Sequence, residues 1–229
     1  YREYTGDFLR EVETLTGCSV IFKRASTFQR FLIGLANQRA KISFVPKHYL
    51  YALNTYGYEA LLEGAKDVSI VLLLRKKGID SRDMASLSGK SVLVASKYTD
   101  SYLYVQDWLK QEGLSDKVAI REHSGQWQGH DSVILSLLAG AIDAGGLSTM
   151  QFRRLPENIL DNFYVLKQSA ATSSILIVSE TVSNEVRDVL INSRNAINLN
   201  KWDVPTASLL KNNHSIRFKR QMDALVSPK

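Results

Sequence analysis

The sequence predicts an α/β protein in which helices alternate with largely parallel strands. Helix-like and strand-like segments follow one another along most of the 229 residues, and this alternation is typical of layered α/β folds. With 45% apolar residues, the chain can bury a substantial core, and its length suits either one large domain or two lobes. Its apolar runs are strand-length, well short of the roughly 18 residues that a transmembrane helix needs.

The first part of the chain predicts two helix–strand pairs. Residues Phe8–Leu15 predict a helix that ends at Gly17, and CSVIF (Cys18–Phe22) predicts the strand that follows. The apolar side chains of Phe28–Ala36 recur at helical spacing, so a second helix is expected there. KISFV, residues 41–45, predicts the next strand.

The middle of the chain continues the alternation. A short helix is expected near Tyr49–Leu53, and a strand at Val68–Leu74. After a turn-rich stretch, SVLVA (Ser91–Ala95) predicts another strand, and YLYVQDWLKQEGL predicts a helix that stops near Gly113.

Two stretches of the chain align with each other. FLIGLANQRAKISFV, residues 31–45, and VILSLLAGAIDAGGL, residues 133–147, each predict a helix, a turn of small residues and an apolar strand. Two ordinary helix–strand units would produce this pattern, and so would a two-lobed protein with one copy in each lobe. The sequence leaves both explanations open.

Charge and cysteine content narrow the class of partner. The formal net charge of +6 favours anionic partners through long-range attraction. The basic residues are scattered and form neither an aromatic-interleaved stripe nor a recognition helix, so no nucleic-acid partner is expected. The single Cys18 excludes an internal disulfide, and the histidines show no metal-ligand spacing, so neither a metal nor a cofactor is expected.

The stretch SKYTDSYLY, Ser96–Tyr104, joins a predicted strand to a predicted helix through a turn rich in hydroxyl groups. A helix start offers unpaired backbone N–H groups and the positive end of the helix dipole, so this turn has the outline of an anion site. Thr99 or Asp100 is placed to cap the helix, and Ser101 and Tyr102 fall in its first turn. Capping alone would also explain these residue types.

Together with GHDSVILSLLAGAIDAGGL, residues 129–147, and KISFVPKHYLYAL, residues 41–53, this turn resembles a known family. The resemblance is to the phosphonate- and phosphite-type periplasmic solute-binding proteins, a branch of the type 2 periplasmic binding-protein superfamily, and it covers roughly residues 1–195. It implies a two-lobed α/β fold, in which each lobe is a mostly parallel sheet flanked by helices and the lobes close around a solute.

The resemblance also nominates residues for ligand binding. The hydroxyl turn would hold the oxyanion of the ligand, a histidine at the start of a later helix would join it, and the loop after the KISFV strand would form a wall. Where the family would place an acidic residue for a ligand amine, this chain offers only Ser148 and Thr149, so an aminophosphonate is not the expected ligand. The nominated residues are Pro46, His48, Tyr49, Tyr98, Thr99, Asp100, Ser101, Tyr102, His130 and Ser148.

One departure from the family concerns the turn between helix and strand in the two aligned stretches. The family's Gly-x-[Ala/Val]-Asp turn is approximately kept at Gly140–Asp143, with Ile142 in its third place. The first stretch has Gln38 and Lys41 where the glycine and the aspartate would stand. With these departures, a divergent sensor domain is as natural an interpretation as a transport receptor.

The two-lobed interpretation assigns residues to lobes. Lobe one comprises residues 1–86 and 169–229, lobe two comprises residues 87–168, and crossings near residues 76–86 and 168–174 lie side by side as a hinge. The chain opens on a helix-like stretch with neither a starter Met nor a signal-peptide core. A signal or anchor is therefore expected upstream of Tyr1, and a first strand there is compatible with this interpretation.

The predicted function is that of a periplasmic or otherwise extracytoplasmic solute-binding module for a small, anionic, phosphonate- or phosphate-like ligand. It would serve as the receptor of an ABC permease or as the sensor domain of a membrane signalling protein, with the membrane reached only through segments outside this sequence. No enzyme activity is expected, because the chain has no G-x-S-x-G and no paired cysteines. The alternatives are an enzyme on the same fold that uses His130 and a cytoplasmic effector-binding domain of a regulator.

Overall fold

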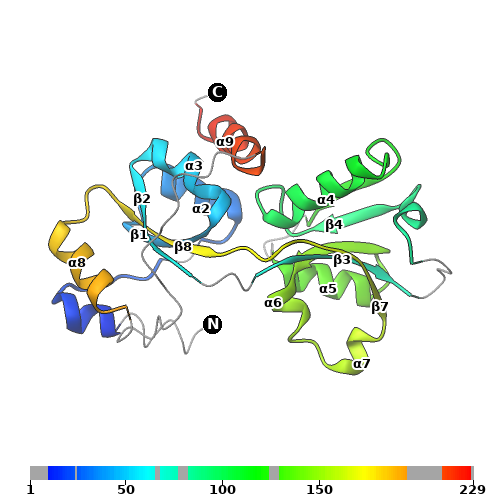
Figure 1. Cartoon of the computed structure of the whole chain (residues 1–229), viewed down its shortest axis with the longest axis horizontal. Coiled ribbons are helices and arrows are strands. Elements are labelled where there is room, and N and C mark those ends of the chain that lie inside the picture. The colour runs from blue at the N-terminus through cyan, green and yellow to red at the C-terminus, as the bar shows by residue number, and fades with distance from the viewer. Residues whose placement is uncertain are drawn as a thin grey trace. The chain divides into compact units, whose positions relative to one another are not determined.

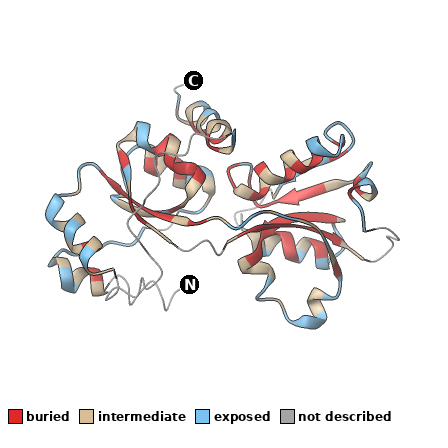
Figure 2. Cartoon of the chain, viewed as in Figure 1, coloured by how far each residue is buried: buried red, intermediate tan, exposed pale blue. Residues whose placement is uncertain are grey.

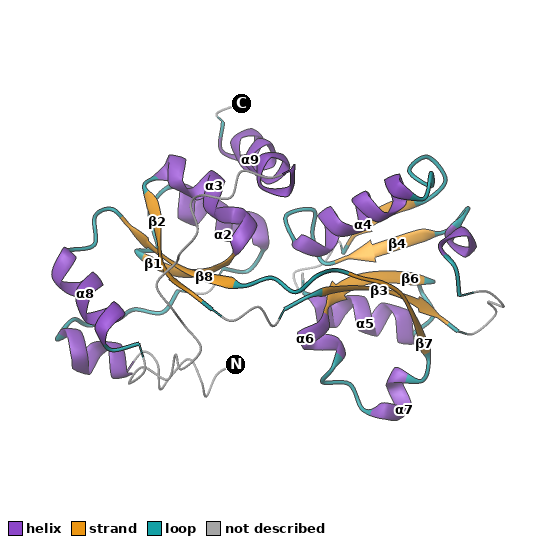
Figure 3. Cartoon of the chain, viewed as in Figure 1, coloured by secondary structure: helices purple, strands orange, loops and turns teal. Residues whose placement is uncertain are grey.

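A computed structural model of the chain describes residues 10–23, 25–64, 68–76, 82–123, 129–194 and 213–227. The chain divides into two compact units, residues 1–25, 29–66 and 172–229 in the first and residues 26–28 and 67–171 in the second. Each unit has its own sheet with helices packed against it (Figure 1, Figure 3). Among the helices of the described ranges, none has both the length and the apolar content to cross a bilayer.

The first unit is built on a three-stranded sheet in the order β1 (Ile42–Pro46), β8 (Ser174–Ser179) and β2 (Tyr58–Glu63). The central strand β8 runs antiparallel to both neighbours. Its apolar side chains from Ile175 to Val178 are buried, and because successive side chains point to opposite faces of a strand, both faces of the sheet are covered there. The helices of this unit are α2 (Phe28–Ala36), η1 (Lys47–Tyr49), α3 (Leu50–Leu53), η2 (Asn54–Tyr56), α8 (Asn184–Asn192) and α9 (Asn213–Val226).

The second unit is built on a five-stranded mixed sheet. Its order is β5 (Ala119–Glu122), β4 (Ser91–Val94), β6 (Ala144–Ser148), β3 (Ile70–Arg75) and β7 (Phe163–Gln168). Strand β4 is parallel to β5 and β6, whereas β3 is antiparallel to β6 and β7. The helices are η3 (Met84–Leu87), α4 (Asp100–Gln111), α5 (His130–Leu138), α6 (Thr149–Phe152) and α7 (Glu157–Leu160).

Helices α4 and α5 cover opposite faces of this sheet (Figure 1). Side chains alternate across a strand, so Leu72 and Leu74 of β3 join Val105 of α4 in one core cluster. Val71 and Leu73 join the buried residues of α5 in the other. Figure 2 shows β3 and β4 almost wholly buried between the two helical layers.

Most of the predicted local elements are confirmed. The predicted helix at Phe28–Ala36 has these bounds in the structure, and residues 10–16 are helical up to Gly17. The predicted strands at residues 41–45, 68–74 and 91–95 correspond to β1, β3 and β4. The helix predicted after SVLVA is α4, which begins at Asp100, directly after Thr99, one of the two residues expected at its cap.

The prediction of a strand at Cys18–Phe22 is wrong. Residues 18–22 have no regular secondary structure, and Ile21 and Phe22 are 78% and 61% exposed. A strand needs a neighbour for its backbone N–H and C=O groups, and none of the described strands pairs with this segment. Apolar, β-branched composition alone could not supply that neighbour.

Two further expectations need correction. The sheets are not mostly parallel, because both pairings of the first sheet and both pairings of β3 are antiparallel. The first boundary between units falls at Lys66 and Asp67 rather than after residue 86, because β3 pairs within the second sheet. The predicted crossing at residues 76–86 lies partly outside the described residues, and the second boundary falls at Ala171 and Thr172. The hinge itself stays a prediction.

Candidate functional site

The turn between β4 and α4 is held together by its own hydroxyl groups. The carbonyl of Ser96 accepts from the backbone N–H of Thr99 at 3.1 Å and from the Thr99 hydroxyl at 2.6 Å. Thr99 is the N-cap residue of α4, with extended φ and ψ of −94° and 156°. Its hydroxyl points back to Ser96 instead of accepting from an amide of the helix, so the position predicted for a cap is occupied but the side chain does not cap.

The hydroxyls of Thr99 and Ser101 form a buried pair, with their oxygen atoms 2.8 Å apart. Because the single Thr99 proton goes to Ser96, Ser101 must be the donor within this pair. Both hydroxyl protons are therefore engaged, and the pair presents oxygen lone pairs. Donation to an oxyanion, as the sequence predicts, requires one of these hydroxyls to rotate.

A glycine lets α4 lie close to strand β6 at this point. A Cβ on Gly146 would lie 2.7 Å from Cγ2 of Val105 and 3.6 Å from Cβ of Ser101. Cβ atoms essentially never come within 3.0 Å of another heavy atom, so a larger residue would require α4 or Val105 to shift away from the sheet. Gly146 thus sets the depth at which the buried hydroxyl pair lies.

The carboxylate of Glu122, on strand β5, stabilises the turn between β4 and α4 through hydrogen bonds. Glu122, the last residue of β5, accepts from the backbone N–H of Lys97 at 2.8 Å and from the Ser96 hydroxyl at 3.3 Å. Tyr98 is 8% exposed; burial raises its pKa, and the Glu122 carboxylate adds to the rise. Sequence analysis missed Glu122, since the pairing of β4 with β5 that brings it here is not a local signal.

His130 is the first residue of α5 and lies within the electrostatic field of the same turn. Burial lowers the pKa of its imidazole to about 4, while the carboxylates of Asp131 and Asp100 act to raise it. The ring is therefore neutral at neutral pH and offers one donor and one acceptor. Its buried Nδ1 has no hydrogen-bond partner among the described residues. The structure thus brings His130 and the turn to one end of the second unit.

Two other nominated residues of this unit have local partners. The hydroxyl oxygen of Tyr102 accepts from Nε2 of Gln106 at 2.9 Å, and its ring packs against the core cluster of α4. Ser148, at the end of β6, is 6% exposed and caps α6 by accepting from the N–H of Met150 at 3.2 Å. A ligand role for either residue remains a prediction.

The nominated residues of the first unit form a packed aromatic group. Tyr49 stacks on Phe218 of α9 with ring centroids 3.9 Å apart, and His48 meets both rings edge-on. Tyr49 is 1% exposed, whereas Pro46, which ends β1, is half-buried. The structure gives Tyr49 a packing role. Phe218 was missed by sequence analysis, although its spacing of four residues from Met222 on α9 is a signal for a buried face.

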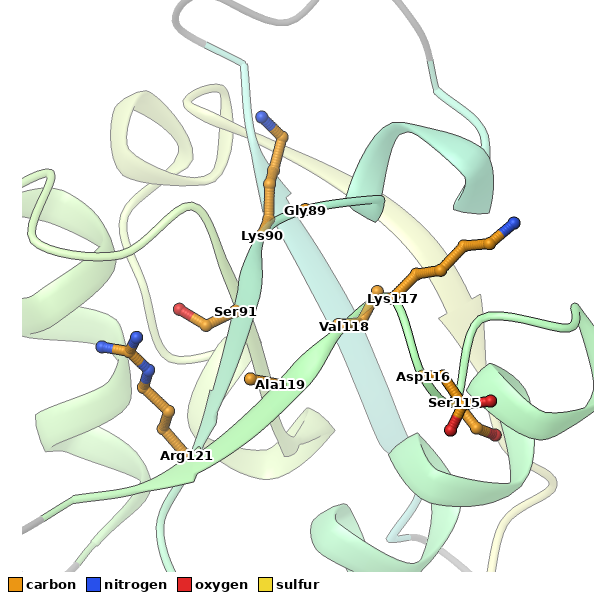
Figure 4. A pocket seen from close by; sticks show the side chains of 9 residues that line it. All are labelled: Gly89, Lys90, Ser91, Ser115, Asp116, Lys117, Val118, Ala119 and Arg121. Carbon is orange, nitrogen blue, oxygen red and sulfur yellow. The ribbon is translucent and has the colours of Figure 1, made fainter.

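The described residues contain no group of three or more His, Cys, Asp or Glu side chains placed to hold a metal. A hollow of about 410 Å³ lies elsewhere, where β4 and β5 begin (Figure 4). The side chains of Lys90 and Lys117 point away from each other there, so they do not converge on a ligand. Its lining residues are Gly89, Lys90, Ser91, Ser115, Asp116, Lys117, Val118, Ala119 and Arg121.

Comparison with known proteins assigns a family to residues 1–198, which match the model of the ABC transporter, phosphonate, periplasmic substrate-binding proteins. No curated protein sequence matches. Among solved structures, PhnD1 from Prochlorococcus marinus in complex with methylphosphonate superimposes with a TM-score of 0.75 at 15% identity, over 97% of this chain and 93% of that one.

Two further solved structures share the fold. A binding protein component of an ABC phosphonate transporter from Pseudomonas aeruginosa has a TM-score of 0.68 at 14% identity, over 99% of this chain and 84% of that one. The alkanesulfonate-binding protein SsuA from Xanthomonas axonopodis pv. citri, bound to MOPS, has a TM-score of 0.63 at 14% identity, over 97% and 78%. The resemblance and the two-lobed α/β fold class deduced from the sequence are confirmed.

Proposed function

This chain belongs to the periplasmic substrate-binding proteins of phosphonate ABC transporters, and on that premise we propose that it binds a small phosphonate- or phosphate-like oxyanion outside the cytoplasm without converting it. The observation that carries the proposal is the joint placement of the α4 start, the Thr99–Ser101 hydroxyl pair and a neutral His130 in one unit. The first-turn amides of α4 and the neutral His130 ring can donate to an oxyanion, and the hydroxyl pair can accept a hydrogen bond from a protonated ligand oxygen.

The chemistry of the turn favours an oxyanion with a low charge. The first-turn amides of α4 and its dipole attract an anion, but Asp100 and Glu122 add negative charge to the same turn. Because the hydroxyl protons of Thr99 and Ser101 are already engaged, the lone pairs of these hydroxyls are left to accept a hydrogen bond from an O–H group of the ligand. A singly protonated phosphonate or phosphate, which brings its own O–H, fits this combination better than a fully ionised one.

Calorimetric titration of the purified protein tests the proposal. We expect methylphosphonate or inorganic phosphate to bind more tightly than methanesulfonate, because the sulfonate carries no proton at neutral pH. A protein that binds none of these probes would show that the proposed ligand class is wrong.

A double variant separates a role of the hydroxyl pair in ligand binding from a purely structural role in the turn. Charge-assisted hydrogen bonds are worth about 1.5–3 kcal/mol each, so Thr99→Ala with Ser101→Ala should weaken binding at least about tenfold. The matched control is Ser183→Ala, which removes the N-cap side chain of α8, where no ligand contact is nominated. If the double variant loses stability like the control and keeps its affinity, the turn is structural only.

Binding without turnover is the second part of the proposal. The alternative, an enzyme that uses His130, would need a nucleophile or a water positioned by the imidazole. Incubating the protein with a phosphonate or phosphoester probe and following free phosphate distinguishes the two. Turnover that disappears in His130→Ala while binding survives would replace the binding function by an enzymatic one.

The physiological partner is proposed to be an ABC permease, as expected for the family, or the signalling portion of its own full-length chain. Either partner would recognise the closed, ligand-bound form of the protein. The ligand favours this form because some of its contacts to the protein form only on closure. Co-purification with a permease encoded beside it, measured with and without methylphosphonate, tests the transport role. A membrane-anchored signalling domain in the full-length chain would support the sensor role instead.

A further inference from the structure

Glu63, the last residue of β2, joins the three strand ends of the first sheet. Its carboxylate accepts from the ammonium group of Lys47, directly after β1, and from the hydroxyl of Ser173, directly before β8, at 2.6 Å. The side chains of Lys47 and Glu63 are each only 15% exposed. The backbone follows the same pattern, since Lys47 N donates to Ser173 O at 3.3 Å and Gly64 N donates to Ser174 O at 2.9 Å.

In the second sheet Thr149, directly after β6, has the position that Lys47 has after β1. Its backbone N–H donates to the carbonyl of Ser69 at 2.8 Å, and its hydroxyl accepts from the Ser69 N–H at 3.1 Å. Gln168 Nε2 donates to the Ser69 hydroxyl at 3.0 Å, which adds the end of β7. Ser69 and Thr149 are 4% and 2% exposed. This network is neutral, whereas the one around Glu63 is charged.

The two networks link equivalent parts of the two units, although they share no residue. Each network joins the residue after a helix–turn–strand copy to two others. One, Glu63 or Ser69, lies next to the first crossing between the units, and the other, Ser173 or Gln168, lies next to the second crossing. In both units the residue that is held follows a nominated ligand residue, Pro46 or Ser148. A displacement of the loop after β1 or of the loop after β6 would therefore strain hydrogen bonds to both chain segments that connect the units.

We propose that Glu63 and Thr149 are positioning residues for ligand binding, which fix the loops after β1 and β6 to the segments that connect the units. The proposal rests on the proposed function, because it requires a ligand that contacts these loops. Neither side chain needs to touch the ligand. The ion pair between Lys47 and Glu63 is largely shielded from solvent, and removing either member would leave the other charge without its partner.

The variant Glu63→Gln tests this role while keeping the shape of the side chain. We expect it to weaken binding of methylphosphonate about three- to tenfold, the range by which residues outside a site modulate coupling. We also expect faster amide hydrogen exchange, without ligand, in peptides that cover residues 42–49 and 173–179. Exchange in β3 and β7 should not change.

Glu59→Gln is the matched control, since Glu59 lies on the same strand and pairs with Arg187, with its own side chain 54% exposed. It should change neither affinity nor exchange in these peptides. In the second unit, Thr149→Val removes the hydroxyl and keeps the volume; we expect faster exchange in peptides covering residues 68–71 and 166–170 and a smaller loss of affinity.

The outcomes separate the two proposals. If the wild-type protein binds none of methylphosphonate, phosphate and methanesulfonate, the proposed function fails and the positioning role fails with it. If the wild-type protein binds and Glu63→Gln matches Glu59→Gln in affinity and in exchange, only the positioning role is wrong. Should Glu63→Gln not fold, Ser173→Ala removes one hydrogen bond and no charge, and it carries the same test.

Discussion

The two helix–turn–strand copies, α2–β1 in the first unit and α5–β6 in the second, have the same local geometry with different side chains. Their elements have equal lengths, and the second copy carries numbers 102 higher, from Phe28 and His130 to Pro46 and Ser148. Both helices end with the same pair of backbone hydrogen bonds. Backbone geometry is therefore conserved between units in which almost every side chain differs.

The turns reach that geometry in two ways. Gly140 has φ of +71°, which glycine adopts freely, and a Cβ there would lie 2.7 Å from Nη1 of Arg75. Gln38 adopts φ of 51° at the equivalent position, where a side chain costs roughly 1–2 kcal/mol. Its amide donates to Tyr56 O at 3.0 Å and accepts from the Ser179 hydroxyl at 3.0 Å. Side-chain hydrogen bonds thus offset a cost that glycine avoids.

The strands differ because their surroundings differ. Strand β1 is an edge strand that pairs with β8, and Phe44 is 44% exposed. Strand β6 lies between β4 and β3 with helices on both faces, and all of its residues are buried. Gly145 and Gly146 fit there because Val133 of α5 and Val105 of α4 approach them from the two faces. Burial on both faces selects small residues where an edge strand accepts a phenylalanine.

The largest expected effect comes from giving β6 a side chain like those of β1. In Gly145→Val, the new Cβ would start 2.5 Å from Cγ1 of Val133, so overpacking should cost at least about 3 kcal/mol of unfolding free energy. Chemical denaturation measures it. The control is Phe44→Val on the exposed strand, which should cost less than about 1 kcal/mol. Equal losses in the two variants would contradict the packing difference.

The second prediction concerns the helix starts, Phe28 in one copy and His130 in the other. The folded-state pKa of His130, about 4, lies below the ordinary histidine value of 6.5 because the imidazole is buried, so the unfolded chain binds more protons between these values. Stability should therefore fall by up to about 2 kcal/mol as pH drops from 8 to 5. His130→Phe, which copies the first unit, should remove this part of the pH dependence in thermal unfolding curves. An unchanged pH profile would mean that His130 is not the group responsible.

The third prediction addresses the turns. Gly140→Ala places a side chain in the left-handed region and against Arg75, so it should cost about 1–2 kcal/mol. Gln38→Gly removes two hydrogen bonds but also the backbone cost, and should change stability by less than about 1 kcal/mol. Urea denaturation of the pair gives the comparison. A larger loss in Gln38→Gly would show that its side-chain bonds dominate.

The smallest effect is expected at the last residue of each turn. Asp143 forms an ion pair with Arg75 at 3.5 Å, and Lys41 donates to the Thr181 hydroxyl at 2.7 Å. Partly exposed pairs contribute about 0.2–1 kcal/mol. Asp143→Ala should therefore be slightly destabilising and sensitive to salt, whereas Lys41→Ala should be nearly neutral. A salt dependence in Lys41→Ala would contradict this assignment.

Several elements and part of the candidate site were predictable because their signals are local. The apolar spacing of Phe28–Ala36 specifies a helix, whose hydrogen bonds join residues only four apart. Gly17 and Gly113, both with positive φ, mark the ends of two other helices. The position of Thr99 at the start of α4 follows from the same rules. The loop of Pro46 to Tyr49 was placed correctly along the chain, but the stacking of Tyr49 on Phe218 depends on a helix far away in sequence.

The sequence by itself determined the helix at Phe28–Ala36, the strands β1, β3 and β4 and the two aligned copies, because each depends on residues that are near one another in the chain. The resemblance to the family came from the order of its motifs along the chain. Only the tertiary structure decided that β8 is the central, antiparallel strand of the first sheet and that residues 18–22 form no strand. It also decided that the Thr99 proton goes to Ser96, and that Glu122 braces the turn. These features depend on which distant segments pair, and pairing is set by burial and backbone hydrogen bonding across the whole unit rather than by local periodicity.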